Sequence, residues 1–140
     1  MISGVDSSVI VAALDEEQPD HDACFALLRQ PSGLHIRAHA LSETFSTLTG
    51  GRAGPRMPAD DVVRALQHNI LPRVVIVDLS VSDHLAAMAE ARSRGIRGGA
   101  IYDYLHLVAA RKISAHRLYT LNIADFRSFH RPGDPEIVHP

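Results

Sequence analysis

The sequence predicts an α/β fold: a three-layer α/β/α domain built around a mainly parallel sheet of four or five strands. Two observations lead to this prediction. Short apolar runs alternate with helical patterns along the chain, and each intervening helix can carry the chain back across the sheet, as parallel pairing requires. The chain has 140 residues, of which 46% are hydrophobic, and both values fit one compact domain covering residues 1–140.

The strands are predicted from short apolar runs that are bounded by turn residues or helical patterns. They cover residues 2–5, 34–38, 74–79, 118–121 and 137–138. The run at 74–79 carries the strongest strand signal, because four β-favouring residues follow one another. The sequence therefore predicts its best strand in the middle of the chain.

The helices between these strands are predicted from apolar stripes and from residues that favour helix starts. Their starts are expected near Ser7 or Ser8, Asp20, His39 or Ser42, Pro58, Ser80 or Ser82, Ala100 and Asp125. The helix from Pro58 should run to about Leu71 and be stopped by Pro72. The next should end at Gly95, and the one from Ala100 near Lys112.

Composition excludes several classes of protein. The single cysteine, Cys24, rules out an internal disulfide and is expected to be a buried apolar residue. The net charge of −2 argues against nucleic-acid binding through bulk positive charge, but not against an enzyme that meets phosphate at a metal cluster. The nine histidines lack the spacing of a zinc site. Without a secretory leader or a long apolar stretch, we expect a soluble, cytoplasmic protein.

Acidic residues gather where a parallel sheet places its working crevice, which is outside the carboxyl ends of the strands. Asp6 directly follows the first predicted strand, and Asn122 and Asp125 follow the fourth. Glu43 and Asp103 lie on helices among apolar neighbours. The topology therefore predicts that residues from four distant segments meet at one edge.

Asp103 is the most informative of these acids. It lies in GGAIYDYLHLVAARKI, a helix that is otherwise almost wholly apolar, and a buried carboxylate is costly unless it is paired or binds a metal. The alternative is a local ion pair, for instance with Arg97. Asp6 alone can be a helix cap, Glu43 a solvated helical residue and Asp125 the cap of a turn.

Four segments occur together in one order along the chain. They are VDSSVIVAAL at 5–14, LSETFSTLT at 41–49, IRGGAIYDYLHLVAA at 96–110 and LYTLNIADF at 118–126. In this order and spacing they resemble the PIN-domain nucleases, and within them the VapC-type toxins of toxin–antitoxin pairs. The resemblance spans nearly the whole chain and implies a PIN-like fold.

The resemblance also implies a metal-dependent endoribonuclease with an acidic quartet of Asp6, Glu43, Asp103 and Asp125. Many relatives have an acid where this chain has Asn122, so the fourth position is Asn122, Asp125 or both. Asp6 and Asp103 are the expected ligands of Mg²⁺ or Mn²⁺, which prefer oxygen donors.

The same resemblance implies an RNA substrate, an antitoxin protein as partner and a homodimer. Candidate substrate-binding residues are Thr120, Arg52 and Arg56, the two arginines lying in a loop rich in glycine and proline. Arg92, Arg94 and Arg97 are read as a solvated basic face, and Asp78 as a structural strand-end residue.

Two other classes of protein remain open at this point. One is a catalytically inactive PIN-like module that binds RNA or acts as a scaffold. The other is a phosphoacceptor receiver domain, which is also α/β with an acidic pocket. Receiver domains need paired acids near the N-terminus and a lysine after a late strand, but Asp6 lacks an acidic neighbour and Lys112 is the only lysine.

Overall fold

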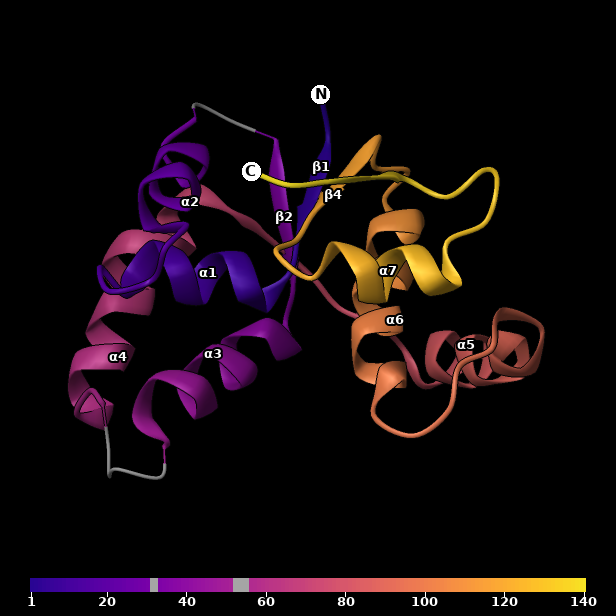
Figure 1. The fold of residues 1–140 in the computed structure, drawn as a ribbon, viewed down its shortest axis with the longest axis horizontal. Helices are drawn as coiled ribbons and strands as arrows, with labels where there is room; N and C mark the ends of the chain where they lie inside the picture. Colours follow the sequence, from indigo (N-terminus) through magenta and orange to yellow (C-terminus); the bar gives the residue numbers. More distant parts are fainter. Residues whose placement is uncertain (31–32, 52–55) are drawn as a thin grey trace.

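The computed structural model describes residues 1–30, 33–51 and 56–140 (Figure 1). In these residues, five parallel strands form one sheet in the order β3-β2-β1-β4-β5. The strands are β1 (Ser3–Val5), β2 (Leu34–Arg37), β3 (Val75–Val77), β4 (Arg117–Tyr119) and β5 (Glu136–Val138). The predicted α/β class and parallel sheet are confirmed.

The helices flank the sheet in two groups, which confirms the three layers. They are α1 (Ser7–Leu14), α2 (His21–Leu28), α3 (His39–Thr49), α4 (Ala59–Ala65), α5 (Val81–Arg94), α6 (Ala100–Lys112) and α7 (Ile123–Phe129). In Figure 1, α1 to α4 lie on the left of the sheet, and α5 to α7 lie on the right. None of the helices in the described residues has the length and hydrophobicity needed to span a bilayer.

Two helix boundaries differ from the sequence prediction. The first helix is capped by Asp6 rather than by Ser7 or Ser8, since the Asp6 carboxylate accepts the backbone N–H of Val9. The helix from Pro58 does not stop at Pro72. It continues from α4 into a π-helical turn and a 3₁₀ turn (Leu71–Arg73), where a proline near the turn's start loses no required hydrogen bond.

The start and end of α5 follow local rules. Ser80 and Asp83 form a reciprocal capping box at its N-terminus, so Ser80 and not Ser82 is the cap. Gly95 ends the helix in the left-handed conformation with φ 70°, which glycine adopts without strain.

The apolar run at 74–79 forms a shorter strand than predicted, and that strand is largely exposed. β3 covers three residues at the edge of the sheet and pairs only with β2. Val75 is 56% exposed and Ile76 is 37% exposed. A run of β-favouring residues shows that a strand forms, but its place in the sheet depends on contacts between distant segments.

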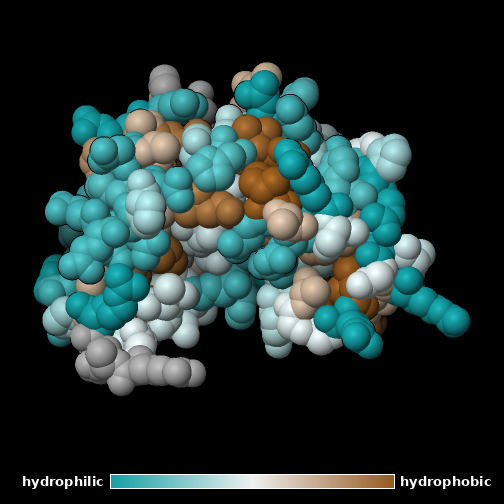
Figure 2. Space-filling view, in the orientation of Figure 1, coloured by the Kyte–Doolittle hydropathy of each residue, from teal (hydrophilic) through white to brown (hydrophobic). Residues whose placement is uncertain are grey.

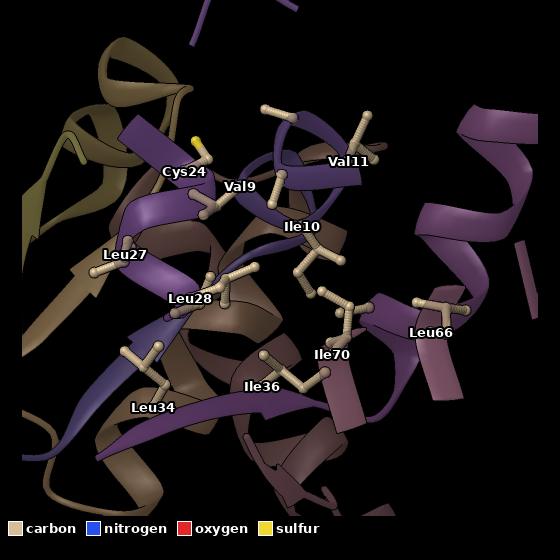
Figure 3. Packing of buried hydrophobic residues seen from close by; sticks show 14 of the residues in the cluster. Val9, Ile10, Val11, Cys24, Leu27, Leu28, Leu34, Ile36, Leu66 and Ile70 are labelled. Atoms are coloured by element: carbon tan, nitrogen blue, oxygen red, sulfur yellow. The ribbon is translucent and has the colours of Figure 1, made fainter. Parts of the chain in front are cut away.

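The core is divided by the sheet into two clusters. Figure 3 shows the first, in which Val9 and Ile10 of α1 pack with Cys24 of α2, Ile36 of β2 and Ile70. Cys24 is fully buried, as predicted, and burial raises the pKa of its thiol to about 11. The second cluster lies between the sheet and α5 to α7 and includes three aromatic residues, Tyr104, Phe126 and Phe129.

The strand order creates a switch point between β1 and β4. From β1 the chain adds β2 and β3 on one side, and it then returns to add β4 and β5 on the other. The connections leave the carboxyl ends of β1 and β4 in opposite directions, which opens a crevice there. Asp6 and Thr120 are the residues that follow these two strands.

Candidate active site

Asp6 is held rigidly at the switch point. Its side chain is 1% exposed, and its carboxylate accepts hydrogen bonds from Ser8 Oγ (2.5 Å), Thr120 Oγ1 (2.6 Å) and the Val9 backbone N–H (3.3 Å). Burial raises the pKa of Asp6, although the charge of His106 and these hydrogen bonds oppose the rise. Asp6 is thus both the helix cap and a buried carboxylate facing the crevice edge.

Thr120 connects β4 to this carboxylate. It is fully buried, donates to Asp6 and accepts the backbone N–H of Asn122 at 3.0 Å. Ser8 Oγ in turn accepts the backbone N–H of Leu121 at 3.0 Å. Two hydrogen bonds, from Thr120 to Asp6 and from Leu121 to Ser8, therefore join the segments that follow β1 and β4. Thr120, predicted from the sequence to bind substrate, is buried and hydrogen-bonds to Asp6 in this structure.

Asp103 lies in the first turn of α6 and is half-buried. Burial raises its pKa to about 6, and the negative charge of Asp6 adds to the rise. Asp125 and Glu43 raise it further, while His106 acts in the opposite direction. In the described part of the chain Asp103 forms no ion pair with Arg97. After burial, the largest influence on the pKa of Asp103 is therefore the carboxylate of Asp6.

Glu43 is hydrogen-bonded to the imidazole of His106. Its carboxylate Oε1 accepts a hydrogen bond from His106 Nε2 at 2.7 Å. Burial raises the pKa of Glu43, but the hydrogen bond from His106, with the charges of His106, His39 and Arg37, outweighs it and leaves the pKa lowered. The cluster therefore contains an acid that stays ionised beside acids that resist ionisation.

Sequence reasoning missed two cationic or polar residues of this cluster, Arg37 and His106. Arg37 ends β2, is 7% exposed, and its Nη1 donates to the Tyr102 carbonyl at 3.4 Å. The strand-end rule that selected Asp6 did not select Arg37, because Arg37 lies inside the strand predicted at 34–38. His106 follows Asp103 by three residues, which places both on one helix face, and this spacing was the available signal.

The remaining candidate site residues are those near α7 and the two arginines predicted to bind substrate. Asn122 precedes α7 and Asp125 lies in its first turn, and both side chains are exposed. Arg56 forms an ion pair with Asp15 at the end of α1, and Arg52 lies outside the described residues.

The basic face expected at Arg92, Arg94 and Arg97 is only partly solvated. Arg92 and Arg97 are exposed. Arg94 instead bonds the carboxylate of Asp134 and lies 5.3 Å from the centre of the Tyr104 ring, which is a structural contact.

A polar groove lies along α3 and includes Glu43. It has a volume of about 450 Å³ and is lined by His39, Ser42, Glu43, Ser46 and Thr47. In Figure 2 the surface is indented at its lower edge, between the two helical groups of Figure 1, and the rim there is mainly hydrophilic or neutral.

An aromatic pair lies beside this groove. Tyr102 is 54% exposed and stacks on His39 with 6.2 Å between ring centres and an interplanar angle of 17°. Tyr104, by contrast, is fully buried. A second hollow of about 450 Å³ lies between α1, α2 and the turns after α4, and its described lining contains none of the four acids.

The donor set of this cluster suits a hard divalent cation. Asp6, Glu43, Asp103 and Asp125 offer carboxylate oxygens. The pKa of Asp103 is raised first by burial and then by the charge of Asp6, and a bound cation would favour the ionised form. Within residues 1–30, 33–51 and 56–140, no three His, Cys, Asp or Glu side chains are already gathered closely enough to form a metal centre. The oxygen chemistry therefore fits Mg²⁺ or Mn²⁺, with ligands that would have to draw together around the ion.

Comparison with known proteins places these features in a family. The family model described as PIN domain matches residues 5–130. No curated protein matches the chain in sequence.

Solved structures resemble it over the full length. Mycobacterium tuberculosis VapC20, a sarcin–ricin-loop-cleaving toxin, is 21% identical with a TM-score of 0.73, covering 99% of both chains. A chain of VapBC2 from Rickettsia felis, bound to a promoter DNA fragment, is 19% identical with a TM-score of 0.68, covering 100% of this chain and 99% of that one. A chain of a Klebsiella pneumoniae toxin–antitoxin complex is 17% identical with a TM-score of 0.64, covering 99% and 95%.

Proposed function

Because this chain belongs to the PIN-domain family, we propose that it is a divalent-metal-dependent endoribonuclease and the toxin of a toxin–antitoxin pair. One observation carries the proposal. Asp103 is a half-buried carboxyl whose pKa is raised first by burial and then by the nearby Asp6 carboxylate, at the crevice of a parallel sheet. Burying mutually repelling acids is costly, and a bound cation offsets that cost.

In this proposal Asp6 and Asp103 are the metal ligands. Asp6 is fixed by three hydrogen bonds, whereas the Asp103 side chain has no hydrogen-bond partner in the described part of the chain. In this proposal Asp103 moves toward the ion. Glu43 and Asp125 complete the quartet, with Asn122 as the alternative to Asp125. A bound Mg²⁺ or Mn²⁺ would polarise the scissile phosphate and lower the pKa of an attacking water.

The chain's own residues would bind and orient the RNA. The groove along α3 offers the hydroxyls of Ser42, Ser46 and Thr47 to phosphate oxygens, and it leads to Glu43. Tyr102 presents one face of its ring to solvent and is braced by His39 on the other, which suits stacking with an unpaired base. The proposed substrate is therefore RNA with a single-stranded segment at the cleavage point.

The proposed partners are an antitoxin and a second copy of this chain. The similar solved structures include a VapBC complex and a toxin–antitoxin complex, which supports an antitoxin for this protein. An antitoxin that covers the acidic crevice would inhibit the enzyme directly, and a cationic side chain placed there would compete with the metal.

The test compares the purified wild type with Asp6→Asn and Asp103→Asn on total RNA in Mn²⁺, Mg²⁺ or EDTA. Asparagine keeps the size of the side chain and the ability of residue 6 to cap α1. We expect cleavage by the wild type in either metal, none in EDTA, and losses of at least about 100-fold in both variants, because metal catalysis contributes several kcal/mol.

The same experiment separates the enzyme from a catalytically inactive PIN-like module. Such a module would retain RNA in a gel-shift assay without cutting it, and its binding would be unaffected by EDTA. Equal cleavage by wild type and both variants would instead show that a contaminating nuclease, and not this site, cuts the RNA.

A further inference from the structure

We propose that His106 is a positioning residue that fixes the Glu43 carboxylate at the proposed metal site through the hydrogen bond from Nε2 to Oε1. The inference rests on the proposed nuclease function and deepens it by assigning a role outside the acidic quartet. Three observations carry it: the geometry of the hydrogen bond, the burial of the imidazole and the surroundings of its second nitrogen.

The hydrogen bond joins two helices on opposite sides of the sheet. Glu43 lies on α3 and His106 on α6, and the two residues are 63 positions apart in the sequence. The distance of 2.7 Å is that of a charge-assisted hydrogen bond. Since an ionised carboxylate can only accept, Nε2 carries the proton and donates it. The contact therefore fixes one carboxylate oxygen of Glu43, Oε1.

The imidazole is rigid because it is enclosed. The His106 side chain is 1% exposed, whereas that of Glu43 is 24% exposed. A small hollow between α6 and the sheet is lined by His106, by apolar residues such as Val5 and Ile36, and by the polar side chains of His35 and Arg37. The enclosed imidazole is thus the fixed partner, and the more exposed glutamate is the one being held.

The second ring nitrogen has no structural task of its own. Nδ1 is buried and has no hydrogen-bond partner among the residues that the structure describes. A histidine kept only for packing would leave both nitrogens poorly satisfied, and an apolar residue would fill the same space at lower cost. The polar function of His106 is therefore concentrated in Nε2 and its bond to Glu43.

Groups that orient metal-binding side chains contribute about 10–100-fold to metal affinity or activity when they are removed. His106 would act in this way on Glu43. Arg37 is a positive charge near Glu43 that lowers the pKa of Glu43. It forms no hydrogen bond to Glu43 among the described contacts, so the direction of the carboxylate depends on His106.

The test measures Mn²⁺ affinity of the metal-free protein by the electron paramagnetic resonance of free Mn²⁺, which needs no RNA. Three variants of His106 differ in whether, and where, the side chain presents an N–H donor. His106→Gln places an amide N–H where Nε2 was, His106→Asn places it where Nδ1 was, and His106→Leu has no donor. His130→Leu is the matched control, because His130 is a partly buried histidine whose Nε2 lies 3.0 Å from the Pro135 carbonyl, away from the acids.

We expect His106→Gln to bind Mn²⁺ within about threefold of the wild type, and His106→Asn and His106→Leu to bind about 10–100-fold more weakly. His130→Leu should bind like the wild type. In a Glu43→Gln background, His106→Leu should cause less than about a threefold further loss, because its partner is already altered.

The possible failures are distinguishable. If His106→Leu, folded by circular dichroism, binds Mn²⁺ as tightly as the wild type, or if His106→Gln is as weak as His106→Leu, the positioning role is wrong while the nuclease proposal stands. Should His106→Leu not fold, His106→Asn gives the same decision. If the wild type itself binds no Mn²⁺, the proposed function fails, and this inference fails with it.

Discussion

Replacing Asp103 by asparagine should stabilise the metal-free protein at neutral and alkaline pH. The pKa of Asp103 is raised to about 6 from an ordinary value of 3.8, first by burial and then by the charge of Asp6. Its ionisation therefore costs folding free energy, and asparagine removes that cost without changing the size of the side chain.

The magnitude follows from linkage between protonation and folding. A carboxyl with this difference between folded and unfolded pKa would cost about 3 kcal/mol when fully ionised. Asp103 is only half-buried, so solvent screening reduces the cost to on the order of 1–2 kcal/mol. In a chain of this length the gain for Asp103→Asn corresponds to a rise in Tm of about 3–8 °C.

The sign of the pH dependence is specific. Above pH 6 Asp103 is ionised in both the folded and the unfolded chain, so the full gain from asparagine is present. Between pH 6 and 3.8 only the unfolded chain is ionised, and the gain shrinks as pH falls. Below 3.8 both states are protonated, and wild type and Asp103→Asn should have similar stability.

The assay is thermal unfolding in EDTA at pH 8 and pH 4, followed by titration with Mn²⁺. Asp78→Asn is the matched control, because Asp78 is an exposed aspartate after β3. Mn²⁺ at 100 times its dissociation constant should stabilise the wild type by about 2.7 kcal/mol, and Asp103→Asn much less. An unchanged or lowered Tm for Asp103→Asn at pH 8 would refute the idea that crowded carboxylates strain this site.

Three further predictions concern substrate binding, the fourth acidic position and stability. Tyr102→Ala should weaken RNA binding about 5–100-fold, as expected for loss of one base-stacking partner, while Phe25→Ala on α2, similarly exposed, should not; electrophoretic mobility shift with a non-cleavable RNA decides it. If Asp125 fills the fourth position, Asp125→Ala should lower the cleavage rate more than Asn122→Ala, measured on one labelled RNA, and the reverse order would assign the role to Asn122. Asp134→Asn should lower the free energy of unfolding by about 2–4 kcal/mol, because the largely buried guanidinium of Arg94 loses its anionic partner. Urea denaturation measures the change, and a value below about 0.5 kcal/mol contradicts this prediction.

The sequence by itself determined the fold class and the location of the crevice. Alternating apolar runs and helical patterns predicted the parallel sheet, because a helical crossover is the short way to join parallel strands. Asp6 and Asp103 were found by local rules: one acid directly follows a strand, and the other interrupts an apolar helix. Burial of Cys24 also followed from its neighbours.

Only the tertiary structure decided how the residues of the site are paired. The bond from His106 to Glu43 joins residues 63 positions apart, and the bond from Thr120 to Asp6 joins residues 114 apart. Such pairs depend on strand order and helix packing, which no local pattern encodes. For the same reason the sequence showed β3 as a strand but not as an exposed edge. The exposure of a strand depends on which other segments pack beside it, and its own residues do not determine that.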